Sequence, residues 1–343
     1  MRLAFIAPPT QTVPPAALGG LDQVRWLAEG LAEGGHHVTL IGAGLGGISA
    51  GRCAVVDTDP TAGQHAEPGA VNHFHAVEAG KALEVLDVQA ISDHTRGGYL
   101  PASARRLPTA QTIYQPMAPL WSPHRVGLPV HVGLVAVSLH QQRQALSLPW
   151  WDVISPAIPL ADHPLSADHT GPCLYLGPLL PGHGARLALD AAHTAGQPIT
   201  LAGGAAGGDA DAYADVELRP RLGTRDRLLR EVGLRERWAL LAQARCLVAP
   251  LLDDEPHSVE IVEALAAGTP VVGLFDTVAA ELVRPGASGL LVMDPGDLGL
   301  AVGKVQRLDL DPKEVREQAA RFDVPVTVNA YEALFDRLLD GGW

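Results

Sequence analysis

The chain has 343 residues, of which 47% are hydrophobic and 18% are charged, and its formal net charge is −13. This length and composition predict about two globular domains with large buried cores and exclude a disordered chain. The acidic balance, with no basic cluster to offset it, excludes a broad nucleic-acid-binding surface.

Short apolar runs alternate with helical patterns along nearly the whole chain. The runs predict strands at 3–7, 38–41, 54–56, 85–91, 110–114, 132–137, 153–155, 173–176, 199–202, 227–232, 246–249, 271–274 and 289–292. The patterns predict helices at 20–33, 186–194, 235–244, 259–267 and 328–339. Nearly continuous apolar strands that alternate with helices indicate parallel sheets covered by helices on both faces.

So many strands rarely form a single sheet, and we therefore expect two doubly wound domains. The boundary is predicted within 156–171, where Pro, Asp, His and Ser cluster without periodicity. The first domain would cover 1–160 and the second 170–325, with a C-terminal helix at 326–343 packing back on the first. Two such sheets facing each other would form a ligand cleft at their carboxyl edges.

The cysteines and the hydropathy indicate a cytoplasmic protein. Cys53, Cys173 and Cys246 are widely spaced and form no CxxC pair, which is typical of reduced thiols. The apolar run at 3–7 is too short for a signal peptide, and no run is long enough to span a bilayer.

Glu255 and Glu263 bracket a segment that runs into the apolar stretch 264–272. Pro256 is well placed to open a helix, on which the two glutamate Cα atoms would lie about 12 Å apart along the axis. A nucleotide-sugar along this face could place its sugar at Glu255, its ribose at Glu263 and its diphosphate at the first helical turn. The alternative is a surface helix with two solvated acids.

Two glycine patterns and the histidines are the remaining candidate motifs. Gly19 and Gly20 open the helix at 20–33 and would let the backbone approach a phosphate or sugar. The GxGxxG pattern at 42–47 precedes no helix, so it does not predict a dinucleotide site. The 14 histidines show no zinc signature, and most of them, including His73 and His75, are interpreted as surface or edge residues. His94 is the exception, because it follows the predicted strand at 85–91, where cleft residues lie.

Taken in order, these segments resemble the retaining glycosyltransferases of family 4, which have the GT-B fold. The similarity covers nearly the full length of the chain. It is carried by ALGGLDQV at 17–24, GGHHVTL at 34–40, LDV to DHT at 86–95, LVAVS at 134–138, YLG at 175–177, LLAQAR at 240–245, the two glutamates, and GTPVV at 268–272.

The resemblance implies an α/β GT-B protein with two doubly wound, Rossmann-like domains facing across a cleft. The nucleotide-sugar would bind mainly to the second domain and the acceptor to the first, without metal or cofactor. Glu263 would bind the ribose and Glu255 the donor sugar. The other residues expected at the donor site are Gly19, Gly20, Gly177 and His183 near the phosphates, His257, Ser258 and Val259 with their backbone amides facing the diphosphate, and Arg230 and Val232 beside the base.

The chain departs from the family pattern within this site. The family's phosphate loop reads roughly GRLSPEKG, whereas this chain has Pro178 at the arginine position and His183 at the lysine position. Removing one donor that stabilises a transition state typically costs about 3–4 kcal/mol. The chain also has His257 and Ser258 where the family has Phe-Gly, and Tyr114 where the family has a histidine.

Two explanations follow. In one, the site is rebuilt: protonated His183 and His257, with Arg96, supply the charge, Ser258 adds a hydroxyl donor, and Glu255, His183, His94 and Tyr114 are catalytic. In the other, the chain is a degenerate transferase that binds a sugar, a nucleotide or a protein partner. A third option is a sugar-nucleotide enzyme that forms a bond other than an O-glycoside. The donor sugar and base, the acceptor and the oligomeric state cannot be predicted.

Overall fold

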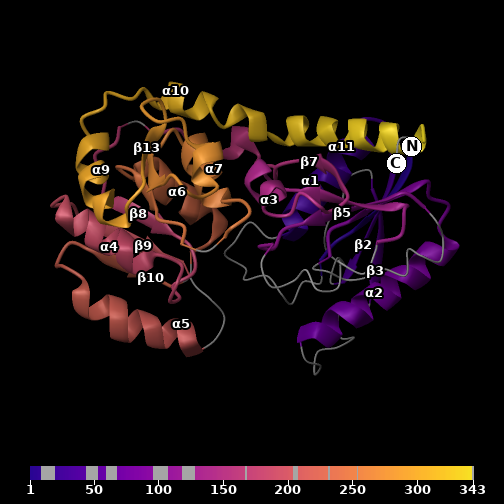
Figure 1. The fold of residues 1–343 in the computed structure, drawn as a ribbon, viewed down its shortest axis with the longest axis horizontal. Helices are drawn as coiled ribbons and strands as arrows, with labels where there is room; N and C mark the ends of the chain where they lie inside the picture. The colour runs from indigo at the N-terminus through magenta and orange to yellow at the C-terminus, as the bar shows by residue number, and fades with distance from the viewer. Residues whose placement is uncertain are drawn as a thin grey trace. The chain divides into compact units, whose positions relative to one another are not determined.

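The computed structural model describes residues 1–8, 20–43, 53–58, 68–95, 107–117, 128–166, 168–203, 208–230, 232–252 and 254–341 (Figure 1). The described residues form two compact units. The first unit runs to Ala157 and resumes at Val324, and the second comprises Ile158–Asp323.

The described strands of the first unit form a parallel seven-stranded sheet in the order β3-β2-β1-β4-β5-β6-β7. They are β1 (Arg2–Ile6), β2 (His37–Ala43), β3 (Ala54–Thr58), β4 (Ala90–Asp93), β5 (Thr109–Ile113), β6 (Val132–Ala136) and β7 (Trp150–Val153). The helices are α1 (Gly20–Glu33), α2 (Pro68–Val85), α3 (Leu139–Gln144) and α11 (Val324–Leu339). The strand order reverses between β1 and β4, because β2 and β3 lie on one side of β1 and β4 to β7 lie on the other.

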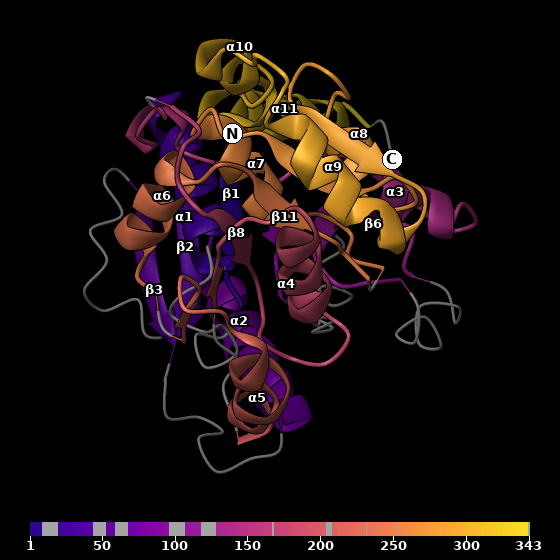
Figure 2. The same ribbon diagram turned by 90° about the vertical axis from the view of Figure 1, so that its left-hand side faces the viewer.

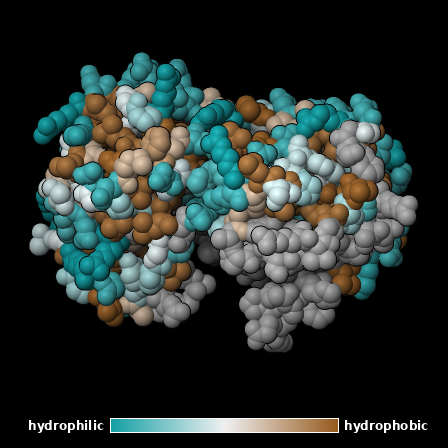
Figure 3. Space-filling view, in the orientation of Figure 1, coloured by the Kyte–Doolittle hydropathy of each residue, from teal (hydrophilic) through white to brown (hydrophobic). Residues whose placement is uncertain are grey.

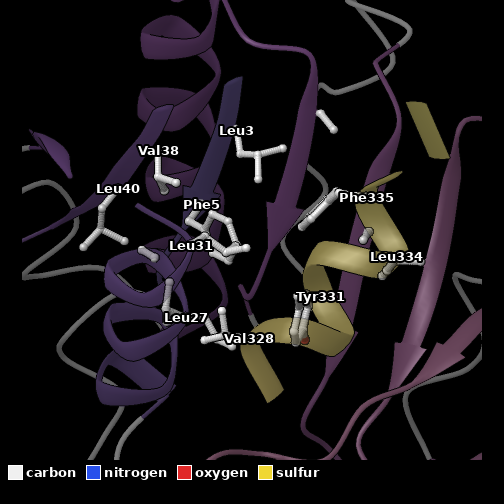
Figure 4. Close-up of a cluster of buried hydrophobic side chains, with 14 of the residues drawn as sticks. Leu3, Phe5, Leu27, Leu31, Val38, Leu40, Val328, Tyr331, Leu334 and Phe335 are labelled. Carbon is white, nitrogen blue, oxygen red and sulfur yellow. The ribbon is translucent and has the colours of Figure 1, made fainter. Parts of the chain in front are cut away.

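Helix α11 completes the core of this unit. Val328, Tyr331, Phe335 and Leu338 recur at helical spacing and are buried against α1 and the sheet (Figure 4). A Cβ at Gly30 would lie 2.5 Å from Val328 Cγ2, so this glycine allows α1 and α11 to approach each other closely. The C-terminal helix is therefore part of the first unit, although it follows the second in the sequence.

The described strands of the second unit form a parallel six-stranded sheet in the order β10-β9-β8-β11-β12-β13. They are β8 (Cys173–Leu176), β9 (Ile199–Ala202), β10 (Arg227–Leu229), β11 (Leu247–Ala249), β12 (Val271–Leu274) and β13 (Gly289–Val292). The α-helices are α4 (Ala185–Thr194), α5 (Gly208–Tyr213), α6 (Leu234–Gln243), α7 (Val259–Ala266), α8 (Ala279–Leu282), α9 (Leu298–Val305) and α10 (Pro312–Glu317). Helices α4 and α9 pack against each other (Figure 2), and α7 packs against α6 and α10. Here the order reverses between β8 and β11.

Two predicted strands are misplaced. The run at 85–91 combines the last residue of α2 with the start of β4, because apolar character alone does not separate a helix end from a strand that follows closely. The strand predicted at 153–155 is observed as Trp150–Val153. The observed helices α2, α3, α5, α8, α9 and α10 are not among the predicted ones.

In the described part of the chain, no helix is long and apolar enough to cross a membrane. Hydrophilic and hydrophobic residues are interspersed on the face drawn in Figure 3.

Candidate functional site

Each sheet has one place where its topology favours ligand binding. Where the strand order reverses, the segments that follow two neighbouring strands leave in opposite directions, and ligands of open α/β sheets bind outside the carboxyl ends there. We call this place the switch point. It lies between β8 and β11 in the second unit and between β1 and β4 in the first.

A glycine-rich loop, 177–184, follows β8 at the second unit's switch point. The buried Tyr175 hydroxyl lies 3.0 Å from the Pro178 carbonyl and 2.9 Å from the His183 carbonyl, so it holds both ends of the loop. Gly184 precedes α4 in the left-handed conformation, with φ 88°, and a Cβ there would lie 2.7 Å from Pro250 Cγ. The loop thus lies directly against the segment that follows β11. Helix α4 starts without a side-chain cap, which suits an N-terminus that receives an anion.

The switch point brings together two of the predicted catalytic residues. His183 Nδ1, from the loop after β8, lies 3.7 Å from Glu255 Oε1, from the segment after β11. Their side chains are 26% and 30% exposed, so both can meet a ligand. The structure therefore brings His183 and Glu255 together, and His183 belongs to the loop that begins at Gly177.

Ser258 caps α7, and this corrects the prediction that Pro256 opens the helix. The helix begins at Val259, and Ser258 Oγ accepts a hydrogen bond from the Ile261 amide at 3.3 Å. The separation expected for Glu255 and Glu263 on one continuous helix therefore does not apply. The Ser258 hydroxyl also donates to Glu260 Oε2 at 3.2 Å, so it is engaged within the helix rather than available to a diphosphate.

His257 is neutral in this structure. Its two ring nitrogens are buried and have no hydrogen-bond partner among the described residues, and its ring meets Phe322 edge to face at 6.1 Å. Burial, reinforced by the nearby Arg321 charge, lowers the pKa of His257 to about 3. Protonation of His257 beside a bound diphosphate stays a prediction.

Glu263 is completely buried between α7 and α6. Arg237 Nε donates to Glu263 Oε2 at 2.6 Å, and Trp238 Nε1 donates to Oε1 at 2.9 Å. Burial raises the pKa of Glu263, although the Arg237 charge opposes this shift. Both carboxylate oxygens are engaged, so a ribose hydroxyl could reach Glu263 only after it exchanged partners. The ribose role stays a prediction.

Arg237 and Trp238 were not predicted as site residues. A signal was available, because Arg237 lies one helical turn before the buried Leu241 on the same face of the predicted helix. A charged side chain on a core-facing stripe requires a buried partner of opposite charge. Local sequence gave no means to identify that partner as Glu263.

Arg230 lies at the same sheet edge, two strands away from the glycine loop. Its Nη1 donates to Asp211 Oδ1 at 2.7 Å, and it also pairs with Asp215. Gly203, after β9, lies between the two places, since a Cβ there would be 1.9 Å from the Gly177 carbonyl oxygen. Val232 is buried nearby in the sequence.

In the first unit, His94 and Tyr114 meet at the carboxyl ends of β4 and β5. His94 Nδ1 lies 2.9 Å from the Tyr114 hydroxyl, His94 Nε2 lies 2.9 Å from Ser92 Oγ, and the ring stacks on Phe5. Burial lowers the pKa of His94 to about 3 and raises that of Tyr114. His94 is therefore a neutral, buried residue that orients the partly exposed Tyr114.

Asp93 is a further buried group at this edge that the sequence did not single out. Its Oδ1 accepts hydrogen bonds from the Thr95 amide at 2.9 Å and the Thr95 hydroxyl at 2.7 Å, and Oδ2 lies 3.4 Å from Gln111 Nε2. Burial outweighs these bonds and raises the pKa of Asp93 to about 7. Gly20 is the first residue of α1, whereas Gly19 and Arg96 lie outside the described residues.

Comparisons with known proteins agree with this architecture. Residues 173–308 match the family described as glycosyl transferases group 1. The chain is similar to AviGT4, a glycosyltransferase involved in avilamycin A biosynthesis, with 25% identity, a TM-score of 0.75 and coverage of 99% of this chain and 98% of that one. Sucrose-phosphate synthase from Thermosynechococcus elongatus matches with a TM-score of 0.77 at 16% identity over 99% of each chain.

The Anabaena protein HepE, solved in complex with UDP and glucose, matches with a TM-score of 0.73 at 18% identity over 98% of this chain and 99% of that one. The fold is that of the GT-B glycosyltransferases. The predicted fold class is thus confirmed, and the residues that match glycosyl transferases group 1 lie within the second unit. An exopolysaccharide phosphotransferase of Streptomyces coelicolor is 34% identical over 113 residues, which are 30% of this chain and only 12% of that protein.

No metal centre is evident in the part of the GT-B chain that the structure describes. There, no three or more His, Cys, Asp or Glu side chains are grouped so that they could hold an ion.

Proposed function

We propose that this GT-B protein is a cytoplasmic glycosyltransferase that moves a sugar from a nucleotide-diphospho-sugar to a small-molecule or carbohydrate acceptor. Transfer would retain the anomeric configuration and require no metal. One observation carries the proposal: His183 and Glu255 meet across the second unit's switch point, beside the glycine loop. A partly exposed imidazole and carboxylate at that position suit a sugar diphosphate.

The donor would lie along the carboxyl edge of the second sheet. The loop 177–184 and the uncapped start of α4 offer backbone N–H groups and the positive end of a helix dipole to the diphosphate. Glu255 would accept hydrogen bonds from hydroxyl groups of the sugar. The base would lie toward Val232, and Glu263 would bind the ribose after exchanging partners.

His183 would supply charge where Pro178 leaves none. An opposite charge within about 4–6 Å favours the protonated form of an imidazole, so a bound diphosphate would keep His183 cationic. The cation would stabilise the departing diphosphate, as fixed donors do in other transfer reactions. On the acceptor side, Tyr114 would contact the acceptor, and His94 would hold the Tyr114 hydroxyl in place.

A second candidate is a GT-B protein that binds a nucleotide, a sugar or a partner protein without catalysis. One observation favours it: the Ser258 hydroxyl donates to Glu260 and His257 is neutral, so neither adds the expected charge or donor to the phosphate end.

Calorimetry with UDP, GDP, ADP and dTDP tests the proposal, followed by turnover of the sugar nucleotide whose base binds. We expect one nucleotide to bind and its sugar to be transferred or hydrolysed. Glu255→Gln should retain nucleotide affinity and lose turnover, whereas Glu236→Gln, at an exposed position of α6, should match the wild type. Absence of binding to all four nucleotides would exclude the transferase, and binding without turnover would establish the second candidate.

A further inference from the structure

Ser92, His94 and Tyr114 form a continuous chain of hydrogen bonds at the carboxyl edge of the first sheet. Ser92 Oγ lies 2.9 Å from His94 Nε2, and the Tyr114 hydroxyl lies 2.9 Å from His94 Nδ1. Ser92 and His94 are 0% and 1% exposed, whereas Tyr114 is partly exposed. The first two residues are therefore closed to water, and Tyr114 is the one that a ligand can reach.

Each bond of this chain has a direction, because the buried imidazole carries a single proton. Burial lowers the pKa of His94 to about 3, so the neutral ring has one N–H donor and one unprotonated acceptor. In one arrangement, Ser92 donates to Nε2, and Nδ1 donates to the Tyr114 oxygen. In the other, Nε2 donates to Ser92, and Tyr114 donates to Nδ1.

Burial of Ser92 favours the first arrangement. Among the described residues, His94 Nε2 is the only hydrogen-bond partner of Ser92 Oγ. In the second arrangement, the Ser92 proton would be enclosed in the interior without an acceptor there, which is unfavourable. The first arrangement instead leaves the Tyr114 proton without an acceptor among those residues, but Tyr114 is partly exposed, so water or a ligand can accept it. Tyr114 is therefore a hydrogen-bond donor toward its ligand.

The chain of bonds lies at the first unit's switch point. Asp93, the last residue of β4, pairs with Ile6 of β1 on one side and with Gln111 of β5 on the other. The His94 amide donates to the Ile6 carbonyl, and Tyr114 directly follows β5. The bond between the two side chains therefore spans the carboxyl ends of these neighbouring strands, outside which an open α/β sheet binds its ligand.

We propose that Ser92 is a positioning residue, which acts through His94 to fix the Tyr114 hydroxyl as a hydrogen-bond donor to an oxygen atom of a carbohydrate acceptor. The inference rests on the proposed transferase function and adds to it the direction of one acceptor contact. Hydroxyl and ether oxygens of a carbohydrate can accept such a bond. Burial raises the pKa of Tyr114, so the hydroxyl stays protonated. Tyr114 therefore binds the acceptor and is not the base that removes its proton.

The direction of the chain can be measured without any ligand. Long-range ¹⁵N–¹H NMR of the imidazoles should show His94 protonated at Nδ1 alone near neutral pH. Its signals should be those that shift most in Tyr114→Phe, which removes the hydroxyl beside Nδ1. A proton on Nε2 would overturn the proposal, because Ser92 would then not donate to the ring and would not fix its tautomer.

Three substitutions separate the roles of the two hydroxyl groups. Tyr114→Phe keeps the aromatic ring and removes the donor. Ser92→Ala removes the hydroxyl that fixes the His94 tautomer, whereas Ser92→Thr keeps one. Transfer to a panel of methyl glycosides is measured with the sugar nucleotide that the wild type turns over, and nucleotide affinity is measured by calorimetry. Ser147→Ala, at an exposed position of the same unit, is the control.

We expect Tyr114→Phe to raise the glycoside KM about tenfold, the effect of one lost hydrogen bond, without changing the affinity for the nucleotide. Ser92→Ala should raise this KM by a smaller factor, and Ser92→Thr should restore it. A glycoside KM equal to that of the wild type in Tyr114→Phe or in Ser92→Ala would overturn the proposal.

Two further outcomes separate this proposal from the transferase function. Nucleotide release by the wild type that no glycoside accelerates would overturn the assignment to a carbohydrate acceptor. Failure of the wild type to bind any nucleotide would instead refute the transferase itself. If the Ser92 variants do not fold, the tautomer of His94 in the wild type and the glycoside KM of Tyr114→Phe still decide.

Discussion

The two switch points share one topology but differ in how they treat charge. In the second unit, His183 and Glu255 stay 26% and 30% exposed, so both can carry charge toward a diphosphate. In the first unit, His94 and Asp93 are fully buried, and burial lowers the pKa of His94 to about 3 and raises that of Asp93 to about 7. The pair in the second unit is open to solvent, whereas burial suppresses charge in the first. Strand order places each site, whereas burial determines the charge it presents.

The largest expected effect tests the buried pair of Arg237 and Glu263 in the second unit. Arg237→Met would leave Glu263 in the interior without its cation, and breaking a buried pair in this way costs about 3–5 kcal/mol. The urea midpoint should fall accordingly. Arg235→Met, at an exposed position two residues earlier, should change stability by no more than about 0.5 kcal/mol. Equal midpoints for the two variants would show that the pair does not hold α6 to α7.

The next effect tests whether the second switch point needs a cation. His183→Gln removes the imidazole beside Glu255, and loss of one leaving-group donor should lower kcat by about 100-fold. Wild-type activity should fall as pH rises and His183 loses its proton. His183→Lys, which stays charged over that range, should retain activity and show a flatter pH–rate profile. A wild-type profile that rises with pH through this range would contradict a cationic role.

A smaller effect tests how closely the glycine loop approaches the segment after β11. Gly184→Ala combines a φ of 88° with a Cβ 2.7 Å from Pro250 Cγ, and should destabilise the protein by about 1–3 kcal/mol. Gly196→Ala is the matched control, because Gly196 also has a positive φ, of 68°, but no described heavy atom lies within 4 Å of the position that a Cβ would take. Chemical denaturation should show the larger loss for Gly184→Ala. Equal losses would mean that backbone conformation alone, and not the contact with Pro250, constrains the loop.

Much of the fold could be predicted because its signals are local. The apolar runs at 173–176, 199–202, 271–274 and 289–292 coincide with observed strands. Alternation of strands with helices predicts parallel sheets, and the structure has two. The boundary errors at 85–91 arise because a helix and a strand there are separated by only a few residues.

The candidate site could be predicted only in part, because partner choice depends on distant residues. The family resemblance implied that His183 and Glu255 belong to one donor site, and the structure brings the two side chains together at the second unit's switch point. Nothing local indicated that Glu263 pairs with Arg237, 26 positions earlier in the chain. His75 resembled a surface histidine in sequence, but it is buried and its Nε2 bonds Ala7, 68 positions away. Burial and long-range pairing therefore determine the charge and the hydrogen-bond partners of these side chains, which composition and spacing do not specify.

A pH-dependent effect tests the suppressed charge at the first switch point. Burial raises the pKa of Asp93 from 3.8 to about 7, so between these values the native state keeps a proton that the unfolded chain releases. The contribution of Asp93 to the free energy of unfolding therefore falls as pH rises through this window, by up to about 1.4 kcal/mol per pH unit, and is constant above it. His94 acts in the opposite sense between pH 3 and 6.5, since burial lowers its pKa and the unfolded chain binds the additional proton.

Asp93→Asn removes the pH-dependent contribution of Asp93 to the free energy of unfolding and leaves that of His94. Its stability relative to the wild type should therefore increase steadily from about pH 4 to about pH 7 and then level off, as measured by urea unfolding at several pH values. Asp340→Asn, at an exposed position of the same unit, should give a curve parallel to that of the wild type. If Asp93→Asn also runs parallel, Asp93 ionises at its ordinary pKa. The first switch point would then carry a negative charge, and the contrast with the second would no longer depend on burial.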